Sequence, residues 1–439
     1  MLMSLLLSVA LIALPQTPAP AAASSTQAPL VATTPSDCVK GAREFTSRRQ
    51  KEMAPLTSEK MTQITGEKVA LEKACAAKFD AATMSPGDQV LLAELYADMN
   101  NMDASATLLN RVRANGKATK TDIGNAISLM VMNGLREPKG DERNARLEKL
   151  VDELDTLGPG AFEQQFLVHS RLNGYYRGDD IDAGIIKHST WLIKAGETCP
   201  PEDRVKLGMT IASAHVNMAE AWAGQGMTDK AINLLKDGMK KWGDISPRPG
   251  TTAADTYFAP ELERLALVGT PAAALTAPNW FNAPAAKELA MPGHVTLLEF
   301  TAHWCGPCRE SYPGVNRLRA KYGPQGFRVA LATQLYGYFE SERNLAAADE
   351  IAKDKTYFAH HELADVPVAI GNKVDIKVVD GKVQYLPGKD PNDVNYKVGG
   401  IPQIMLIDKK GNIRLIMVGY DDANEAKLAA IIESLLKEK

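Results

Sequence analysis

Apolar residues follow a helical period over the first part of the chain. From residue 38 to about residue 269 they recur at spacings of three and four with almost no alternation, which predicts helices throughout. The helices come in pairs, and the pairs that start near Asp88, Thr121, Ala161 and Asp203 lie 33 to 42 residues apart. Paired helices at such intervals are typical of an all-α helical-repeat domain, an α-solenoid. The alternative is an irregular helical bundle.

The last helix pair, over residues 211–242, resembles a tetratricopeptide repeat. Gly226 lies where the turn between the two helices belongs, and Ala231 takes the place of the small residue at which the helices pack. The concave surface of a solenoid implies a peptide or protein partner for residues 38–269.

The pattern changes after a stretch rich in alanine and proline. Residues 270–284 carry three prolines among alanines, and we place a domain boundary there. Apolar runs of strand length then alternate with helical segments, which predicts an α/β domain over residues 270–439. We expect strands at 295–300, 327–332, 366–370, 374–379, 382–385, 404–408 and 413–418, and helices from the cysteine motif to 322, at 341–361 and at 424–436.

Two cysteines, Cys305 and Cys308, enclose Gly306 and Pro307 where a predicted strand meets a predicted helix. At a helix N-terminus, unsatisfied backbone N–H groups and the helix dipole stabilise a thiolate on Cys305. Cys308 lies one turn further along, within reach of a mixed disulfide formed on Cys305. The spacing predicts a redox-active disulfide. Half of a zinc site is the alternative, but no second Cys-x-x-Cys and no His-x-x-x-His follows, so we expect no metal.

The stretch from Leu297 to Cys308, LLEFTAHWCGPC, resembles the thioredoxin superfamily, and in particular its exported TlpA/ResA-like branch. A second landmark is Gly400-Ile401-Pro402, which precedes an apolar strand as the cis-proline loop of that family does. The resemblance covers residues 276–439. It implies a thioredoxin fold and thiol–disulfide exchange without a bound cofactor.

The roles of the family's residues carry over to matching positions. Cys305 is then the nucleophile and Cys308 the resolving thiol. Glu299 takes the place of the family's buried acid, whose pKa is raised by desolvation and which exchanges a proton with Cys308. The alternative for Glu299 is a strand residue that faces water. A cis Pro402 would place the backbone of Ile401 beside the disulfide, where it pairs with a substrate peptide; the alternative is an ordinary turn.

The residues that flank the cysteine motif and the proline loop are expected to shape the substrate surface or the reactivity of Cys305. Trp304 is expected to pack beside the nucleophile and to contact substrate. His303 either tunes the Cys305 thiolate or is an exposed bystander. Gln403 stands where thioredoxins usually carry threonine, and residues 371–398 form a longer segment than the family has before the cis-proline. We expect that segment to rebuild the substrate surface.

The N-terminus predicts export. Residues 2–14 are almost wholly apolar and residues 19–25 are small, which is typical of a signal peptide over 1–23. A linker rich in Ala, Pro, Ser and Thr follows over 24–37. No Lys or Arg precedes the apolar run, and an N-terminal membrane anchor is the alternative. Either way the folded part is expected outside the cytoplasm, in the periplasm.

The remaining cysteines predict one structural disulfide, between Cys38 and Cys75. Residues 38–54 and 57–79 both have helical patterns, and Pro55 separates them. If these helices form an antiparallel hairpin, both cysteines lie near its open end, since a helix rises about 1.5 Å per residue. Cys199 is then the unpaired cysteine. The alternatives are two free thiols or a bridge from either cysteine to Cys199.

These features favour an exported thiol–disulfide oxidoreductase that reduces disulfides of protein substrates. Such a reductase needs a membrane-bound or exported electron donor as a partner. A peroxiredoxin would need Thr three residues before its cysteine, and Thr301 is four before Cys305. A third possibility is a helical-repeat binding module whose redox domain regulates partner capture. The net charge of −3, without a basic stripe, argues against nucleic acid as a partner.

Overall fold

The structure, a computed structural model of the chain, describes residues 33–178, 181–246, 248–282, 288–374, 376–379, 382–385, 390–420 and 422–438. The predicted signal peptide and most of the predicted linker lie outside these residues. The chain forms two compact units, which divide between Asn133 and Gly134. No helix in the described ranges combines the length and the apolar character that crossing a bilayer requires.

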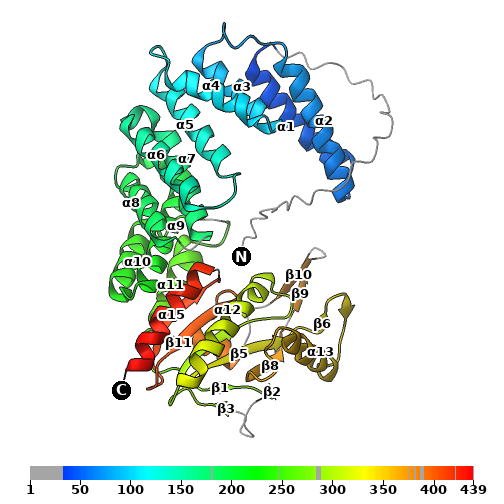
Figure 1. Cartoon of the computed structure of the whole chain (residues 1–439), viewed down its shortest axis with the longest axis vertical. Coiled ribbons are helices and arrows are strands. Elements are labelled where there is room, and N and C mark those ends of the chain that lie inside the picture. Colours follow the sequence, from blue (N-terminus) through cyan, green and yellow to red (C-terminus); the bar gives the residue numbers. More distant parts are fainter. Residues whose placement is uncertain are drawn as a thin grey trace. The chain divides into compact units, whose positions relative to one another are not determined.

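The first unit consists of helices, drawn in blue and cyan in Figure 1. They are α1 (Pro35–Glu52), α2 (Ser58–Ala76), α3 (Pro86–Asp98), α4 (Met102–Arg113) and α5 (Lys120–Gly134). α1 begins three residues before the predicted start because Thr34 caps it. The Thr34 hydroxyl accepts a hydrogen bond from the N–H of Asp37, and the Asp37 carboxylate accepts one from the N–H of Thr34. Pro55 lies in the turn between α1 and α2, which pack against each other.

The second unit begins with further helices. They are α6 (Asp141–Thr156), α7 (Phe162–Gly178), α8 (Asp182–Glu197), α9 (Arg204–Gly224), α10 (Thr228–Trp242) and α11 (Ala259–Leu265). α7 packs on α8, α8 on α9 and α9 on α10, and a shared apolar core includes Ile211 and Leu235. Gly226 turns the chain between α9 and α10 with a φ of 79°, which glycine adopts at little cost. Ala231 is fully buried. The predicted helices are present, and their repeat character stays a prediction.

A mixed six-stranded sheet follows, in the order β12-β11-β4-β5-β8-β2. β4, β5 and β8 run parallel, whereas β11 pairs antiparallel with β4, β12 with β11 and β2 with β8. A mixed sheet fits the thioredoxin fold that the resemblance implied, but the edge strand β2 was not predicted. The strands of the sheet are β2 (Asn279–Phe281), β4 (Val295–Phe300), β5 (Phe327–Leu335), β8 (Val368–Lys373), β11 (Gln403–Ile407) and β12 (Ile413–Val418).

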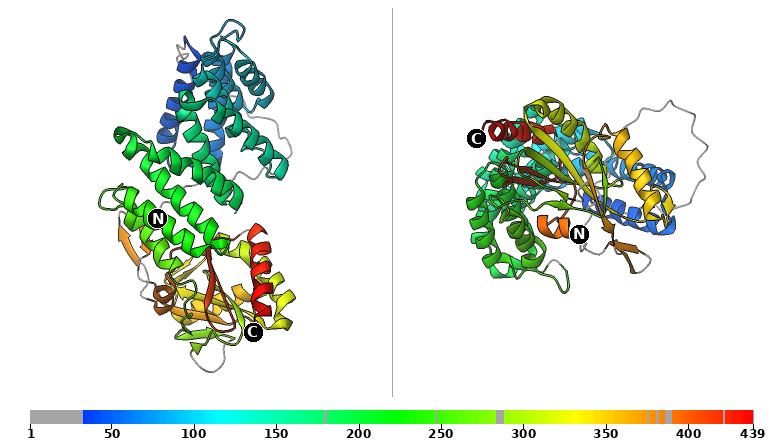
Figure 2. Two further views of the ribbon diagram at one scale, coloured as in Figure 1. Left: turned by 90° about the vertical axis from the view of Figure 1, so that its left-hand side faces the viewer. Right: turned by 90° about the horizontal axis from the view of Figure 1, so that it is seen from below.

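Helices cover both faces of this sheet. α12 (Gly306–Tyr322), α13 (Ala347–His360) and α15 (Asp422–Lys437) lie on one face, and α15, coloured red, runs along the sheet in Figures 1 and 2. The short pair β1 (Leu275–Thr276) and β3 (Glu288–Leu289), with α14 (Pro391–Tyr396), covers the other. Successive strand residues point to opposite faces, so Leu297 and Glu299 of β4 both face α12.

Two hairpins extend from the sheet. The predicted one, β9 (Ile376–Val379) with β10 (Lys382–Tyr385), is confirmed, although Asp380 and Gly381 lie outside the described residues. The other, β6 (Tyr338–Phe339) with β7 (Glu342–Arg343), replaces the start of the helix predicted at 341–361. Glu340 and Asn344 have positive φ angles of 50° and 57°, which a helix does not allow, so α13 begins only at Ala347.

The outermost strand, β12, is covered by chain that precedes the sheet. The N–H groups of Gly269 and Ala272 donate to the carbonyl oxygens of Ile413 and Gly411, each at 2.7 Å, and Ile413 donates to Thr270 at 2.9 Å. Helix α9 contacts the same strand. The start of the stretch predicted as a domain boundary is thus hydrogen-bonded to the sheet.

Candidate active site

The redox motif lies where β4 ends and α12 begins. Cys305 is the N-cap residue of α12, and its Sγ accepts a hydrogen bond of 3.2 Å from the N–H of Cys308. The two cysteines form a disulfide, with Cα atoms 5.2 Å apart. Pro307 fits in the first turn, where its missing N–H costs no helical hydrogen bond. Cys305 is 3% exposed and Cys308 is fully buried, so of the two sulfurs only that of Cys305 is open to attack.

Glu299 lies beneath this motif, inside the domain. Its side chain is fully buried on the face of β4 that α12 covers, which excludes the alternative of a residue facing water. Desolvation raises the pKa of this carboxyl group to about 8, and a hydrogen bond from Ser311 opposes the rise. Ser311 Oγ donates to Glu299 Oε1 at 2.8 Å, whereas Oε2 has no hydrogen-bond partner among the described residues. Glu299 is therefore largely protonated at neutral pH beside the oxidised pair.

Ser311 was not among the predicted site residues. Its hydroxyl lies 2.7 Å from the carbonyl oxygen of Cys308 as well as within hydrogen-bonding distance of Glu299. The position, one helical turn after Cys308, places Ser311 on the same side of α12 as that cysteine, and this spacing was the available sequence signal. Its neighbour Tyr312 is also fully buried and shares a hydrogen bond of 2.6 Å with the Thr301 hydroxyl.

The predicted cis-proline loop lies against the motif. The Ile401–Pro402 peptide bond is cis, and the half-buried Ile401 packs on the core that contains Cys305 and Cys308. Gln403, the departure from the thioredoxin pattern, is fully buried and holds this loop. Its amide donates to the carbonyl oxygen of Tyr396 at 2.9 Å and accepts from the N–H of Gly399 at 3.4 Å. The amide thereby ties the loop to α14.

Trp304 and His303 differ sharply in exposure. Trp304 is 41% exposed and meets the ring of Tyr336 edge-on at 5.3 Å, so a substrate near Cys305 can reach it. His303, expected either to tune the thiolate or to be exposed, is buried and stacks on Phe339 at 4.9 Å. Desolvation lowers the pKa of His303 to about 4, so the ring is neutral at physiological pH. The exposed-bystander expectation is therefore wrong, because a cage of aromatic rings encloses the imidazole.

The remaining predicted pair lies in the first unit. Cys38 of α1 and Cys75 of α2 form a disulfide with Cα atoms 5.9 Å apart, and both side chains are buried. The antiparallel hairpin around Pro55 brings them together. Cys199 is the free cysteine and is half-buried.

Among solved structures, a candidate thiol:disulfide interchange protein DsbE from Chlorobium tepidum is 26% identical, over 38% of this chain and 97% of its own, with a TM-score of 0.28. A thiol-disulfide isomerase from Corynebacterium glutamicum is 20% identical, over 38% of this chain and 97% of its own, with a TM-score of 0.28. A search with protein-family profiles and one of curated proteins gave no match. The similar structures are thioredoxin-like thiol:disulfide interchange proteins, and they cover only the C-terminal part of this chain.

Proposed function

We propose that this chain is an exported thiol–disulfide oxidoreductase that reduces disulfides of protein substrates through Cys305 and Cys308. The observation that carries the proposal is the cysteine pair at the N-terminus of α12, above a buried carboxyl group with a pKa of about 8. A purely structural cysteine pair would not need a carboxyl group beneath it. Burying a carboxyl group without a charged partner costs free energy, which argues for a functional role.

The reaction begins with the reduced protein. The Cys305 thiolate attacks one sulfur of the substrate disulfide, which forms a mixed disulfide and releases the other substrate sulfur as a thiolate. Cys308 then loses its proton and attacks Cys305 Sγ. This step releases the second substrate thiolate and leaves the Cys305–Cys308 disulfide. Two electrons pass from the cysteine pair to the substrate, and an exported or membrane-bound dithiol donor returns them by the reverse exchange.

Glu299 serves the second step. Cys308 is fully buried, so its proton needs an acceptor inside the protein. The pKa of Glu299, about 8, is close to the pKa of an ordinary cysteine thiol. Two groups with similar pKa values exchange a proton readily in both directions. Ser311 positions the acid, since its hydroxyl contacts both Glu299 and the carbonyl oxygen of Cys308.

Export to the periplasm is part of the proposal. The apolar run at residues 2–14 supports it, and so does the Cys38–Cys75 disulfide, because structural disulfides persist in oxidising compartments. An uncleaved apolar segment would anchor the protein to the membrane.

Trapping tests the proposal. In a Cys199→Ser background, Cys308→Ala should accumulate a mixed disulfide with its substrates, because the resolving thiol is absent. Cys305→Ser is the matched control and should trap nothing. The parent protein should also catalyse reduction of insulin by dithiothreitol, and Cys305→Ser should not. Equal trapping by both variants, or no catalysis by the parent protein, would instead favour a binding module.

A further inference from the structure

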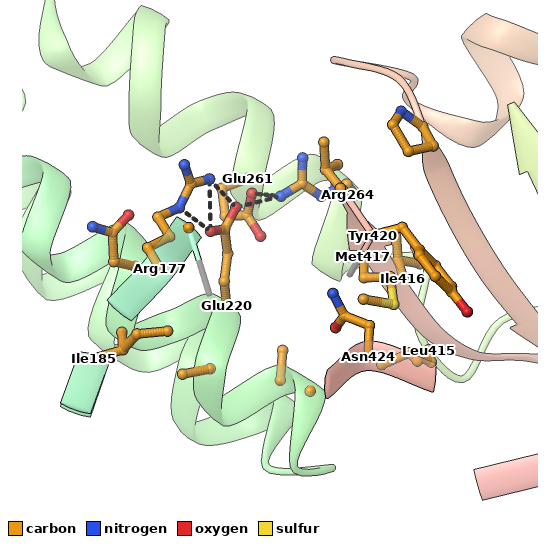
Figure 3. A pocket seen from close by; sticks show the side chains of 18 of the residues that line it. Arg177, Ile185, Glu220, Glu261, Arg264, Leu415, Ile416, Met417, Tyr420 and Asn424 are labelled. Carbon is orange, nitrogen blue, oxygen red and sulfur yellow. Dashed lines mark hydrogen bonds and ion pairs between the residues drawn. The ribbon is translucent and has the colours of Figure 1, made fainter. Parts of the chain in front are cut away.

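A cavity of about 520 Å³ lies beside the redox motif (Figure 3). One wall holds Pro307 of the motif, with Ile401 and Pro402 of the cis-proline loop. The opposite wall belongs to the helical region and comes from α7, α9 and α11. A substrate chain that pairs with the backbone of Ile401 would therefore have the helices on its other side.

Charged side chains from three helices meet on the helical wall. Glu220 of α9 lies between two arginines: Arg177 of α7 donates to it through Nε at 3.0 Å, and Arg264 of α11 through Nη2 at 3.0 Å. Arg264 also pairs with Glu261 one turn earlier on α11. Figure 3 shows these four side chains facing one another at the cavity.

This cluster has more donors than acceptors. Arg264 is nearly buried, with a side chain 10% exposed, and its Nε has no hydrogen-bond partner within the described residues. Glu220 is shared by both arginines. Burial, with repulsion from Glu220, raises the pKa of Glu261, which weakens its contribution of negative charge. Lys427, also on the cavity, has its own partner in Asp182 at 3.4 Å. The cluster thus leaves one guanidinium N–H, at Arg264 Nε, without an acceptor, and one carboxylate oxygen, Glu261 Oε1, without a donor among the described residues.

The arginines are also placed where a bound chain would pass. The Arg177 side chain is 49% exposed although it is ion-paired. A Cβ atom at Gly399 would lie 4.0 Å from Arg264 Nη1, so this guanidinium lies beside the loop that leads to Ile401. Guanidinium groups bind carboxylates through paired, charge-assisted hydrogen bonds.

We propose that this cavity binds the part of a substrate chain next to its cysteine, and that Arg177 and Arg264 recognise an acidic side chain there. The inference rests on the proposed function and names its substrate class, disulfide-bearing segments with an acidic residue beside the cysteine. The helical region then selects substrates for the redox motif.

End-capped peptides, each dimerised through one cysteine, test this inference. Glutamate, glutamine or lysine flanks the cysteine, and the reduced full-length protein is the reductant. Each kcat/KM is divided by the rate with bis(2-hydroxyethyl) disulfide on the same preparation, which corrects for any loss of folded protein. We expect the parent protein to prefer the glutamate peptide over the glutamine peptide about tenfold, as one charge-assisted hydrogen bond would give.

Two variants should move this preference in opposite directions. Arg177→Gln should lower it to about twofold, whereas Glu220→Gln should raise it, because both arginines then lack their shared carboxylate. Arg204→Gln removes an ion-paired arginine of α9 outside the cavity and should change nothing. Two results would overturn this inference while leaving the proposed function intact. One is a parent protein that reduces bis(2-hydroxyethyl) disulfide but does not prefer the glutamate peptide. The other is a loss of that preference in Arg204→Gln equal to the loss in Arg177→Gln. A protein that reduces none of these disulfides would refute the proposed function itself.

Discussion

Ser311 Oγ lies 2.8 Å from Glu299 Oε1 and 2.7 Å from the carbonyl oxygen of Cys308. One hydroxyl therefore links the buried acid on β4 to the helical turn that carries the resolving cysteine. The link fixes Glu299 while leaving its Oε2 without a partner among the described residues, so that oxygen can take a proton whenever the carboxyl group is ionised.

Replacement of Glu299 should slow the step in which Cys308 attacks. Glu299→Gln keeps the shape and the hydrogen bond from Ser311 but cannot accept a proton. We expect single-turnover oxidation of the reduced protein by a peptide disulfide to fall about a hundredfold at pH 7. The pH–rate profile should also lose its inflection near pH 8. An unchanged profile would remove Glu299 from the mechanism.

Ser311→Ala gives a distinct signature. The hydrogen bond from Ser311 lowers the pKa of Glu299 against the effect of burial, so its loss should raise that pKa further. The inflection in the pH–rate profile should move to higher pH instead of disappearing. A profile that stays in place would show that Ser311 has only a structural role.

Glu299 also makes stability depend on pH. Its folded-state pKa, about 8, lies above the ordinary value of 4.5, so the folded state binds this proton more tightly than the unfolded state. The resulting stabilisation is complete below pH 4.5 and is lost as the pH rises towards 8. We expect Glu299→Gln to gain about 3 kcal/mol relative to the parent protein between pH 5.5 and 8 in urea unfolding of the oxidised form. Glu433→Gln, at an exposed position of α15, should show no such gain.

The imidazole of His303 should not influence the nucleophile electrostatically. With a pKa of about 4 it carries no charge at neutral pH. The rate at which iodoacetamide alkylates reduced Cys305 follows the fraction of thiolate at each pH. We therefore expect this rate to reach half of its maximum at the same pH in His303→Phe as in the parent protein. Phenylalanine keeps the stacking on Phe339. A shift to higher pH in the variant would show that a charged imidazolium stabilises the thiolate.

The disulfide in the first unit should stabilise that unit. Cys38 and Cys75 are 37 residues apart, and closing a loop of this size lowers the entropy of the unfolded chain enough to stabilise the folded state by about 4 kcal/mol. We expect the double variant Cys38→Ala, Cys75→Ala to lose that amount of unfolding free energy. Urea unfolding with amide hydrogen exchange of α1 and α2 as the readout measures the loss. Cys199→Ala is the control and should retain both the bridge and the stability. Non-reducing peptide maps that show Cys38 and Cys75 as free thiols would contradict the assignment.

Local patterns were enough to place most of the α/β region. The apolar run of β4, the cysteine spacing at α12 and the Asp380-Gly381 sequence between two apolar stretches each predict an element from neighbouring residues. The cysteine spacing also identified Cys305 and Cys308, whereas Glu299 and Pro402 were assigned through the resemblance to the thioredoxin superfamily.

What local patterns missed depends on contacts between distant segments. β2 lies in the stretch where we placed the domain boundary, and it is a strand because Trp280 and its neighbours pair with β8. The hairpin β6–β7 interrupts a helical pattern, since Glu350 accepts hydrogen bonds from the backbone N–H groups of Tyr336 and Gly337 and holds the preceding chain. The pair of Arg177 with Glu220 joins residues 43 positions apart, for which a single sequence holds no local signal.

The cover over β12 has a consequence for the solubility of the protein. An uncovered outer strand presents unpaired N–H and C=O groups to which another molecule can add a strand. In this chain Gly269, Thr270 and Ala272 occupy one end of β12, and α9 lies against the strand. A fragment that began at residue 273 would lose both and would favour edge-to-edge association between copies. The helical region is therefore also an intramolecular protection against aggregation.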